Sequence, residues 1–183
     1  MTEGDTLLSI YSNEAISAEM KQECTKAFVF GHERNPEQDI LFLVNEMVEI
    51  IARALSSGMN DPFTAITCMN WLQLTLKKVA ELIPPSVYRY DGMNQLRVIA
   101  SPIYFAEFCD IIFGRTIPYL CKDRNATLHL LKIIHRLYTR ISCEDYRSLL
   151  KQYANSLKNA ATDAQIAEQA HEVQKHYLNY FSV

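Results

Sequence analysis

Long apolar segments are missing from this sequence of 183 residues. A helix that spans a bilayer needs roughly 20 consecutive apolar residues, whereas the longest apolar fragments here are short, such as residues 40–44. The N-terminus also lacks the basic and apolar parts of a secretory signal. We therefore expect the chain as it stands to be soluble.

Glycine and proline are scarce, with five and six residues. No stretch is low in complexity and no run of like charge occurs, which argues against a disordered tail or a long linker. Because 49% of the residues are hydrophobic and 21% are charged, the chain can bury a sizeable core and falls within the size range of one compact domain.

A surplus of positive charge is absent too. The formal net charge is -3, and the lysines and arginines are scattered along the chain, so we expect no nucleic-acid partner. The five cysteines are an odd number and lie far apart in the sequence. They cannot all pair within one chain, and a reducing compartment fits them best.

The motifs of familiar enzymes are not found. The sequence has no Cys-x-x-Cys pair, no Walker loop, no glycine-rich dinucleotide turn and no Gly-x-Ser-x-Gly elbow. Glu168 and His171 have the Glu-x-x-His spacing of di-iron bundles, but such sites need this unit twice. We therefore predict no catalytic residue, no metal site and no cofactor, and we expect that the chain is not an enzyme.

What is present is a series of helical patterns. From about residue 17, apolar residues recur at helical spacing until Gly31. Asn35 and Pro36 predict the start of a helix over residues 36–55, and Asp61 with Pro62 predicts the start of another that ends near residue 82. These two helices should form a tight helical hairpin.

The rest of the chain predicts one β-hairpin and further helices. The turn sequence at 91–94 lies between two short β-type segments, which predicts a hairpin at about 87–99. Two strands alone are marginal in water, so the hairpin should lie against the helices or against a part of the parent protein outside this sequence. Helical patterns follow at 102–113, with a break or kink at Gly114 and Pro118, and at 126–140, 143–159 and 163–181.

The predicted fold class is therefore all-α, with about seven helices in an antiparallel, bundle-like array and one small β-hairpin. Residues 1–16 are interpreted as an extended segment left over from an upstream region. Residues 17–183 are predicted to form a single helical domain.

The first candidate site is a charged stripe on the predicted helix 36–55. Asp39, Glu46, Glu49 and Arg53 are spaced so that they share one side of this helix, whose other residues are mostly apolar. Buried charges must be paired, so Arg53 should meet Glu49 one turn back. A structural seam of ion pairs, a ligand pocket and a catalytic site all remain open.

The second candidate is the loop 56–64, which joins the end of one helix to the start of the next. Backbone donors after Asp61 could hold an anion, but a capping Asp61 carboxylate would satisfy them and lock the loop instead. If a ligand does bind here, Asn60 and Thr64 are its expected contacts, together with Arg34 and Gln38 from the other end of the helix.

Three blocks of sequence resemble a known family. The blocks ERNPEQD (33–39), ARALS (52–56) and GMNDPFTA (58–65) are similar to the signature of an uncharacterised bacterial family of predicted membrane proteins, the domain of unknown function DUF 2254. Ser57 stands where that family usually has proline, and Glu49 stands where it usually has aspartate. The resemblance fades after about residue 138.

The resemblance implies that the chain is the soluble C-terminal domain of an integral membrane protein, cut from it just before residue 1. We then expect a non-catalytic role in assembly or regulation of the membrane part, with the domain on the cytoplasmic side of the cell membrane. Its expected partner is the N-terminal transmembrane region of its own full-length chain, and a homo-oligomer is left open. The alternatives are a sensory domain that binds a small ligand or ion in the 34–64 region, and an unrecognised hydrolase or metalloenzyme.

Overall fold

The chain forms two compact units, and the described part of the first, residues 4–28 of 1–35, contains one short helix. A computed structural model describes residues 4–28, 39–84 and 86–181, and the second unit comprises residues 36–183. In the first unit an extended segment precedes α1 (Ala18–Lys26), none of whose residues is buried. The hydroxyl of Ser17 caps α1 by accepting a 3.1 Å hydrogen bond from the N–H of Met20. The helix ends at Lys26, earlier than the predicted end at Gly31, and the predicted boundary after residue 16 stays a prediction.

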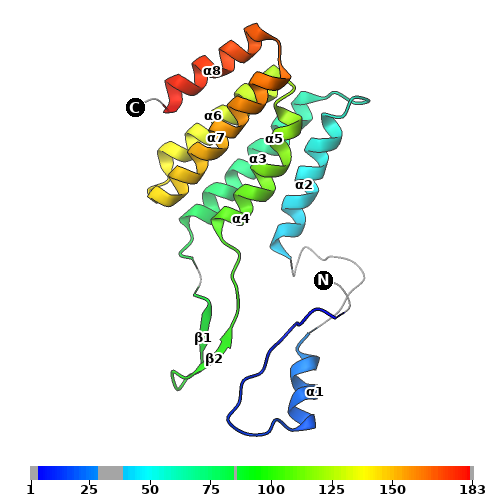
Figure 1. Cartoon of the computed structure of the whole chain (residues 1–183), viewed down its shortest axis with the longest axis vertical. Coiled ribbons are helices and arrows are strands. Elements are labelled where there is room, and N and C mark those ends of the chain that lie inside the picture. Colours follow the sequence, from blue (N-terminus) through cyan, green and yellow to red (C-terminus); the bar gives the residue numbers. More distant parts are fainter. Residues whose placement is uncertain (1–3, 29–38, 85, 182–183) are drawn as a thin grey trace. The chain divides into compact units, whose positions relative to one another are not determined.

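The second unit is helical, with its helices side by side and the β-hairpin projecting from one end of them (Figure 1). If α4, η1 and α5 are counted as one continuous helix, the described residues of both units contain seven helices and one two-stranded antiparallel sheet. The predicted fold class is confirmed. The elements are α2 (Ile40–Ala54), α3 (Pro62–Glu81), β1 (Tyr88–Tyr90), β2 (Leu96–Ile99), α4 (Phe105–Cys109), the π-helical turn η1 (Asp110–Gly114), α5 (Arg115–Leu120), α6 (Arg124–Arg140), α7 (Glu144–Ala164) and α8 (Ala167–Phe181).

The predicted helical hairpin of α2 and α3 is present, but α2 begins later than predicted. Asp39 has an extended backbone and caps α2, because its Oδ1 accepts a 3.0 Å hydrogen bond from the N–H of Leu41. The helix starts at Ile40, and the predicted cap Asn35 and predicted first residue Pro36 lie outside the described residues. The start of α3 at Pro62 is as predicted.

The helix does not break at Gly114 and Pro118, and the kink, which is the other form of that prediction, stays a prediction. The chain stays helical from Phe105 to Leu120, and the turn just before Pro118 is the π-helical turn η1. Such a turn is one of the ways in which a helix absorbs an irregularity without ending. Thr116 is fully buried within this segment and donates its hydroxyl hydrogen to the carbonyl of Ile112 at 2.5 Å.

The core of the second unit is centred on α6, which packs against α3, α7 and α8. Its buried side follows the helical repeat, and Leu130, Leu131 and Ile134 are fully buried there. The helix α7 continues to Ala164, beyond its predicted end at 159. Just after α7, Nε2 of Gln165 donates to the carbonyl of Cys121 at 2.7 Å and to Oγ1 of Thr127 at 2.8 Å. These bonds tie the connection between α7 and α8 to the connection between α5 and α6.

Candidate functional site

The charged stripe of α2 lies on its exposed side. Arg53 donates from Nη2 to Oε2 of Glu49 at 2.9 Å, which is the one-turn pair that the spacing predicts. The Arg53 and Glu49 side chains are 76% and 57% exposed, and Glu46 is exposed as well. The expectation of a polar seam on a buried helix is therefore wrong.

The reason is that α2 is covered on one side alone. Its buried residues are Val44, Val48, Ile51 and Ala54. Other apolar residues of the same helix, Ile40, Leu43 and Ile50, are exposed. Apolar residues on both sides make the helix look fully buried in the sequence, although a helix in a globular protein often buries one stripe.

The loop between α2 and α3 is held by Asp61. Its Oδ1 accepts hydrogen bonds of 3.1 Å from the N–H groups of Phe63 and Thr64, and its Oδ2 accepts one of 2.5 Å from the Thr64 hydroxyl. The hydroxyl and the N–H of Thr64 lower the pKa of Asp61 below its usual value, because they stabilise the ionised carboxylate. The first-turn donors of α3 are thus engaged by the protein's own carboxylate.

A second contact closes the same loop. The N–H of Asp61 donates to the carbonyl of Ala54 at 2.7 Å, at the end of α2. Asn60 adopts the left-handed conformation with φ 45°, which asparagine tolerates better than most residues. The loop is therefore tied to both helices that it joins.

The structure brings some of the predicted site residues together. Glu49 pairs with Arg53, and Asp61 with Thr64, while Asp39 caps the other end of α2. Arg34 and Gln38 lie outside the described residues. Within the described ranges, no group of three or more His, Cys, Asp or Glu side chains could hold a metal ion. A ligand-binding role for these residues stays a prediction.

The β-hairpin has an apolar face that the sequence analysis missed. Tyr88 lies opposite Ile99, and a register shift after Arg89 places Tyr90 opposite Leu96. Residues two apart on a strand, and residues opposite each other on paired strands, share a face. Without the shift, Arg97 would lie opposite Tyr90. The bulge therefore gathers Tyr88, Tyr90, Leu96 and Ile99 into one surface, which we call the apolar hairpin face.

This face is not covered. Its four side chains are 45% to 66% exposed, and no residue of either strand is buried. The turn beside it is firmly built, because Oδ1 of Asp91 accepts 2.9 Å hydrogen bonds from the N–H groups of Met93 and Gln95. Backbone donation from Gln95 and then the Arg97 side chain lower the pKa of Asp91. Asn94 in this turn has a positive φ of 59°, which asparagine tolerates better than most residues.

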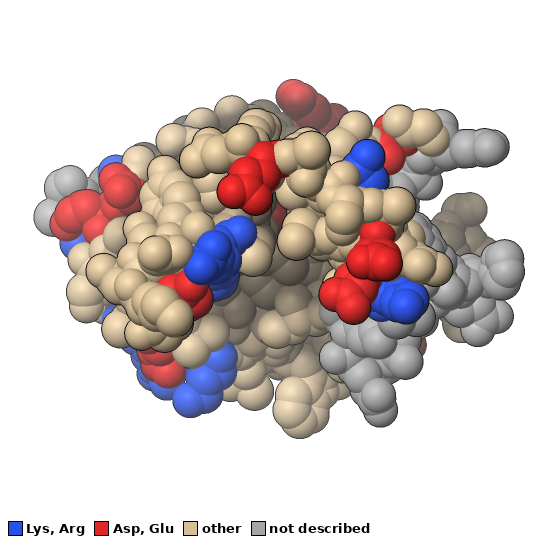
Figure 2. Space-filling model, turned by 90° about the horizontal axis from the view of Figure 1, so that it is seen from below, with Lys and Arg blue, Asp and Glu red and all other residues tan. Residues whose placement is uncertain are grey.

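A second apolar surface lies where α2, α3, α4 and α7 meet. It is a groove of about 340 Å³, and two of the residues at its edge, Leu82 and Ile83, are 66% and 90% exposed. In the view from below, most of the described residues that can be seen are neither acidic nor Lys or Arg (Figure 2). The groove is lined by Ile40, Val79, Leu82, Ile83, Pro84, Ile103, Tyr104, Phe105, Phe108 and Tyr146.

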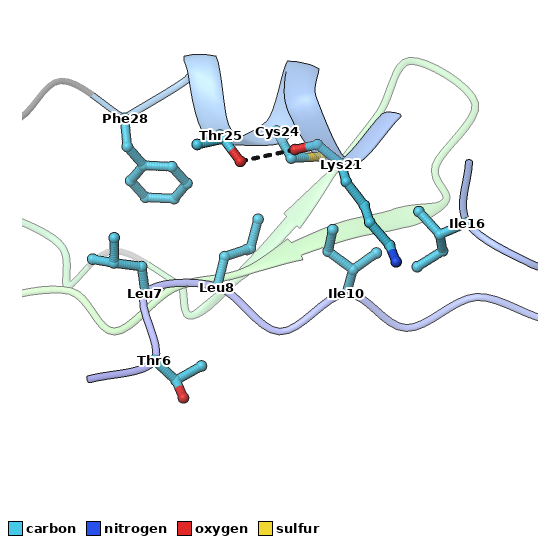
Figure 3. Close-up of a pocket in the computed structure, with 9 residues that line it drawn as sticks. All are labelled: Thr6, Leu7, Leu8, Ile10, Ile16, Lys21, Cys24, Thr25 and Phe28. Atoms are coloured by element: carbon cyan, nitrogen blue, oxygen red, sulfur yellow. Dashed lines mark hydrogen bonds between the residues drawn. The ribbon is translucent and has the colours of Figure 1, made fainter. Parts of the chain in front are cut away.

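The first unit has a hollow of its own, of about 500 Å³. Leu8 and Ile10 point from the extended segment toward α1, while Thr6 points away (Figure 3). The Thr25 hydroxyl donates to the carbonyl of Lys21 at 2.9 Å and so belongs to the helix itself. The hollow is an open and mainly apolar surface.

Comparisons with known proteins match the chain to a family of predicted membrane proteins. Residues 1–136 match the family described as "Predicted membrane protein (DUF2254)". The uncharacterized proteins Rv1290c of Mycobacterium tuberculosis and Mb1321c of Mycobacterium bovis are each 35% identical to this chain over 82 residues, which is 45% of this chain and 16% of each relative. The matched part is thus a small share of the length of these relatives. No solved structure matches the chain.

The helices themselves show no bilayer-spanning segment. Among those in residues 4–28, 39–84 and 86–181, none combines the length and the apolar character that crossing a membrane requires. The family match nevertheless extends from residue 1 to residue 136, which is most of the sequence. The chain belongs to the DUF2254 family of predicted membrane proteins, whose function is unknown.

Proposed function

We propose that this chain is a non-catalytic domain of a longer integral membrane protein, and that it supports the assembly or regulation of the membrane part by docking to it. The family description and the much greater length of the relatives support a larger parent protein. All five cysteines are free, which supports a position on the reducing, cytoplasmic side.

The observation that carries this proposal is the apolar hairpin face. A two-stranded hairpin is marginally stable in water unless it packs on something, and this one presents two aromatic and two aliphatic side chains to solvent. Full burial of a Leu or Ile side chain contributes about 1.5–3 kcal/mol. Leu96 and Ile99, at 45% and 66% exposure, therefore have roughly half of that stabilisation left to gain by docking.

The position of the charges agrees with this account. Arg97 donates from Nε to Oδ2 of Asp91 at 2.7 Å, so the one carboxylate of the turn is paired with an arginine of the hairpin. Large contiguous apolar patches that are exposed and rimmed by polar groups mark interaction sites. The hairpin and the groove at the base of the helices are two such surfaces.

The test is site-specific photo-cross-linking in the full-length gene product, in native membranes. A photoreactive residue replaces Ile99 on the hairpin face or, as a matched control, Ile166 beside α8. The two isoleucines are 66% and 65% exposed, so they differ in location and not in accessibility.

We expect the residue at 99 to form cross-links to the membrane part of the same protein and the residue at 166 to form few or none. Equal cross-linking from both positions would contradict the proposal, as would a full-length product that is absent from the membrane fraction. Cross-links from 99 to a second copy of this domain would point to a homo-oligomer and would also contradict docking to the membrane part.

A further inference from the structure

A fourth surface differs in its chemistry from the three apolar ones, because basic and polar side chains line it. It is a hollow of about 360 Å³ between α3, α6 and α8, here called the α6 hollow. Three of its lining residues carry basic groups, namely His129, Lys132 and His176. Asn125 and Tyr180 add an amide and a hydroxyl, and no carboxylate lines it.

The charge around the α6 hollow is positive because of the composition of α6. This helix contains Arg124, Lys132, Arg136 and Arg140 but no aspartate or glutamate. The lysines and arginines look scattered in the sequence, yet four of them lie on this one element. A positive potential of this kind attracts anions to the concave surface beneath it.

Glu172, a carboxylate of the neighbouring helix α8, is already paired with an arginine of α6. Arg124 donates from Nε and Nη2 to the two carboxylate oxygens of Glu172, at 2.5 and 2.6 Å. This two-point geometry is the strongest arrangement available to an arginine and a carboxylate. Glu172 therefore compensates Arg124, and Lys132 has no ion-pair partner among the described residues.

His129, one of the two histidines of α6, is partly buried beside these positive charges. His129 Nε2 lies 2.8 Å from Oδ1 of Asn70 on α3, and since an amide oxygen accepts, Nε2 donates. Burial, followed by the charges of Arg136 and Lys132, lowers the pKa of His129. The groups beside it are Lys132 and Arg136 from α6, Asn70 from α3, and His176 and Tyr180 from α8. Glu172 of α8 lies near His176 and is paired with Arg124.

We propose that the α6 hollow binds a phosphate group, carried either by a free phosphorylated small molecule or by a phospholipid headgroup. Lys132 supplies the permanent charge. Asn125 and Tyr180 supply hydrogen bonds, His176 lines the same hollow, and His129 adds a second ring donor when it is protonated. An anion in the hollow offsets the repulsion from Lys132 and Arg136, so binding and protonation of His129 strengthen each other.

The test uses the whole chain and three probes: inorganic phosphate, sulfate, and vesicles of phosphatidylcholine with or without phosphatidic acid. Binding of the small anions is followed by NMR of the His129 and His176 rings, and binding to vesicles by co-sedimentation. Lys132→Gln is compared with Lys151→Gln, which removes the same charge from an exposed position on α7.

We expect Lys132→Gln to weaken binding about tenfold, the usual effect of losing one charge-assisted hydrogen bond, and Lys151→Gln to leave it nearly unchanged. Sulfate keeps its charge between about pH 6 and pH 8, so tighter binding at the lower pH reports histidine protonation. Saturation with sulfate should raise the pKa of His129.

The pattern of binding identifies the source of the phosphate group. Binding that depends on Lys132 for both inorganic phosphate and acidic vesicles supports a site that accepts either carrier. If only the binding to acidic vesicles depends on Lys132, the ligand is a phospholipid headgroup. If only the binding of inorganic phosphate depends on Lys132, the ligand is a free phosphorylated molecule. Absence of binding, equal weakening by both substitutions, or an unchanged pKa of His129 at saturation would overturn the proposal.

Discussion

Replacement of Gly114 by alanine tests how the continuous helix from α4 to α5 is built. Gly114 has the ordinary helical angles φ -58° and ψ -41°, so an alanine adopts its backbone without strain. Glycine within a helix costs about 1 kcal/mol relative to alanine. The substitution should therefore stabilise the protein unless the new methyl group meets an obstacle.

One obstacle is present. A Cβ at position 114 would lie 2.9 Å from Oδ1 of Asp110, which is too close. This oxygen belongs to the end of an exposed and flexible side chain, and its contact with the Tyr153 hydroxyl is long, at 3.5 Å. Rotation of the Asp110 carboxylate therefore costs little, and we expect a net gain of about 0.5–1 kcal/mol in the free energy of unfolding.

Urea unfolding and a thermal melt measure the effect. A gain of this size raises the melting temperature of a chain of this length by roughly 1–4 °C. The control is Gly114→Ala in an Asp110→Ala background, where the obstacle is gone and the gain should be at least as large. Destabilisation in both backgrounds would show that the π-helical turn itself requires glycine, and the reasoning would be refuted.

Three further predictions concern stability and reactivity. Gln165→Ala should lower the free energy of unfolding by about 1–3 kcal/mol, measured in urea, because two part-buried acceptors lose their donor; no change would show that water replaces it. The exposed thiol of Cys143 should react with a thiol reagent in the native protein, whereas Cys109, whose pKa is raised by burial, should react after unfolding; equal rates would contradict its burial. The lowered pKa of Asp61 contributes stability that is present above about pH 4 and is lost as the pH falls further, so the urea midpoint of Asp61→Asn should depend less steeply on acid pH than that of the wild type.

Local signals in the sequence predicted the helix starts and turns that depend on neighbouring residues. Asp61 with Pro62 starts α3 as expected, and Asn94 takes the positive φ of the hairpin turn. Two sequences that can start a helix precede α2, namely Asn35 with Pro36 and, after them, Asp39. The observed cap of α2 is Asp39. A capping motif can be recognised from a few neighbouring residues. Which of two capping motifs is used depends on where the helix begins to pack against the rest of the protein.

The sequence did not predict the features that depend on contacts between distant parts of the chain. The exposure of Glu49 and Arg53 depends on which side of α2 is covered. Because apolar residues lie on both sides of the helix, the sequence does not show which side that is. The apolar hairpin face depends on a one-residue register shift, which changes the partner of Tyr90. The sequence places the helix breakers Gly114 and Pro118 in this segment, but the chain stays helical there and forms a π-helical turn before Pro118.

Hydrogen exchange of the hairpin amides tests the docking proposal most directly. The rates are compared between the isolated 183-residue chain and the full-length gene product in lipid nanodiscs. The fully buried region around Leu130 in α6 serves as the internal reference, since its protection should be the same in both samples. The account predicts rapid exchange at residues 88–99 in the isolated chain and clear protection of the same residues in the full-length protein. Equally rapid exchange of these residues in both samples would contradict it.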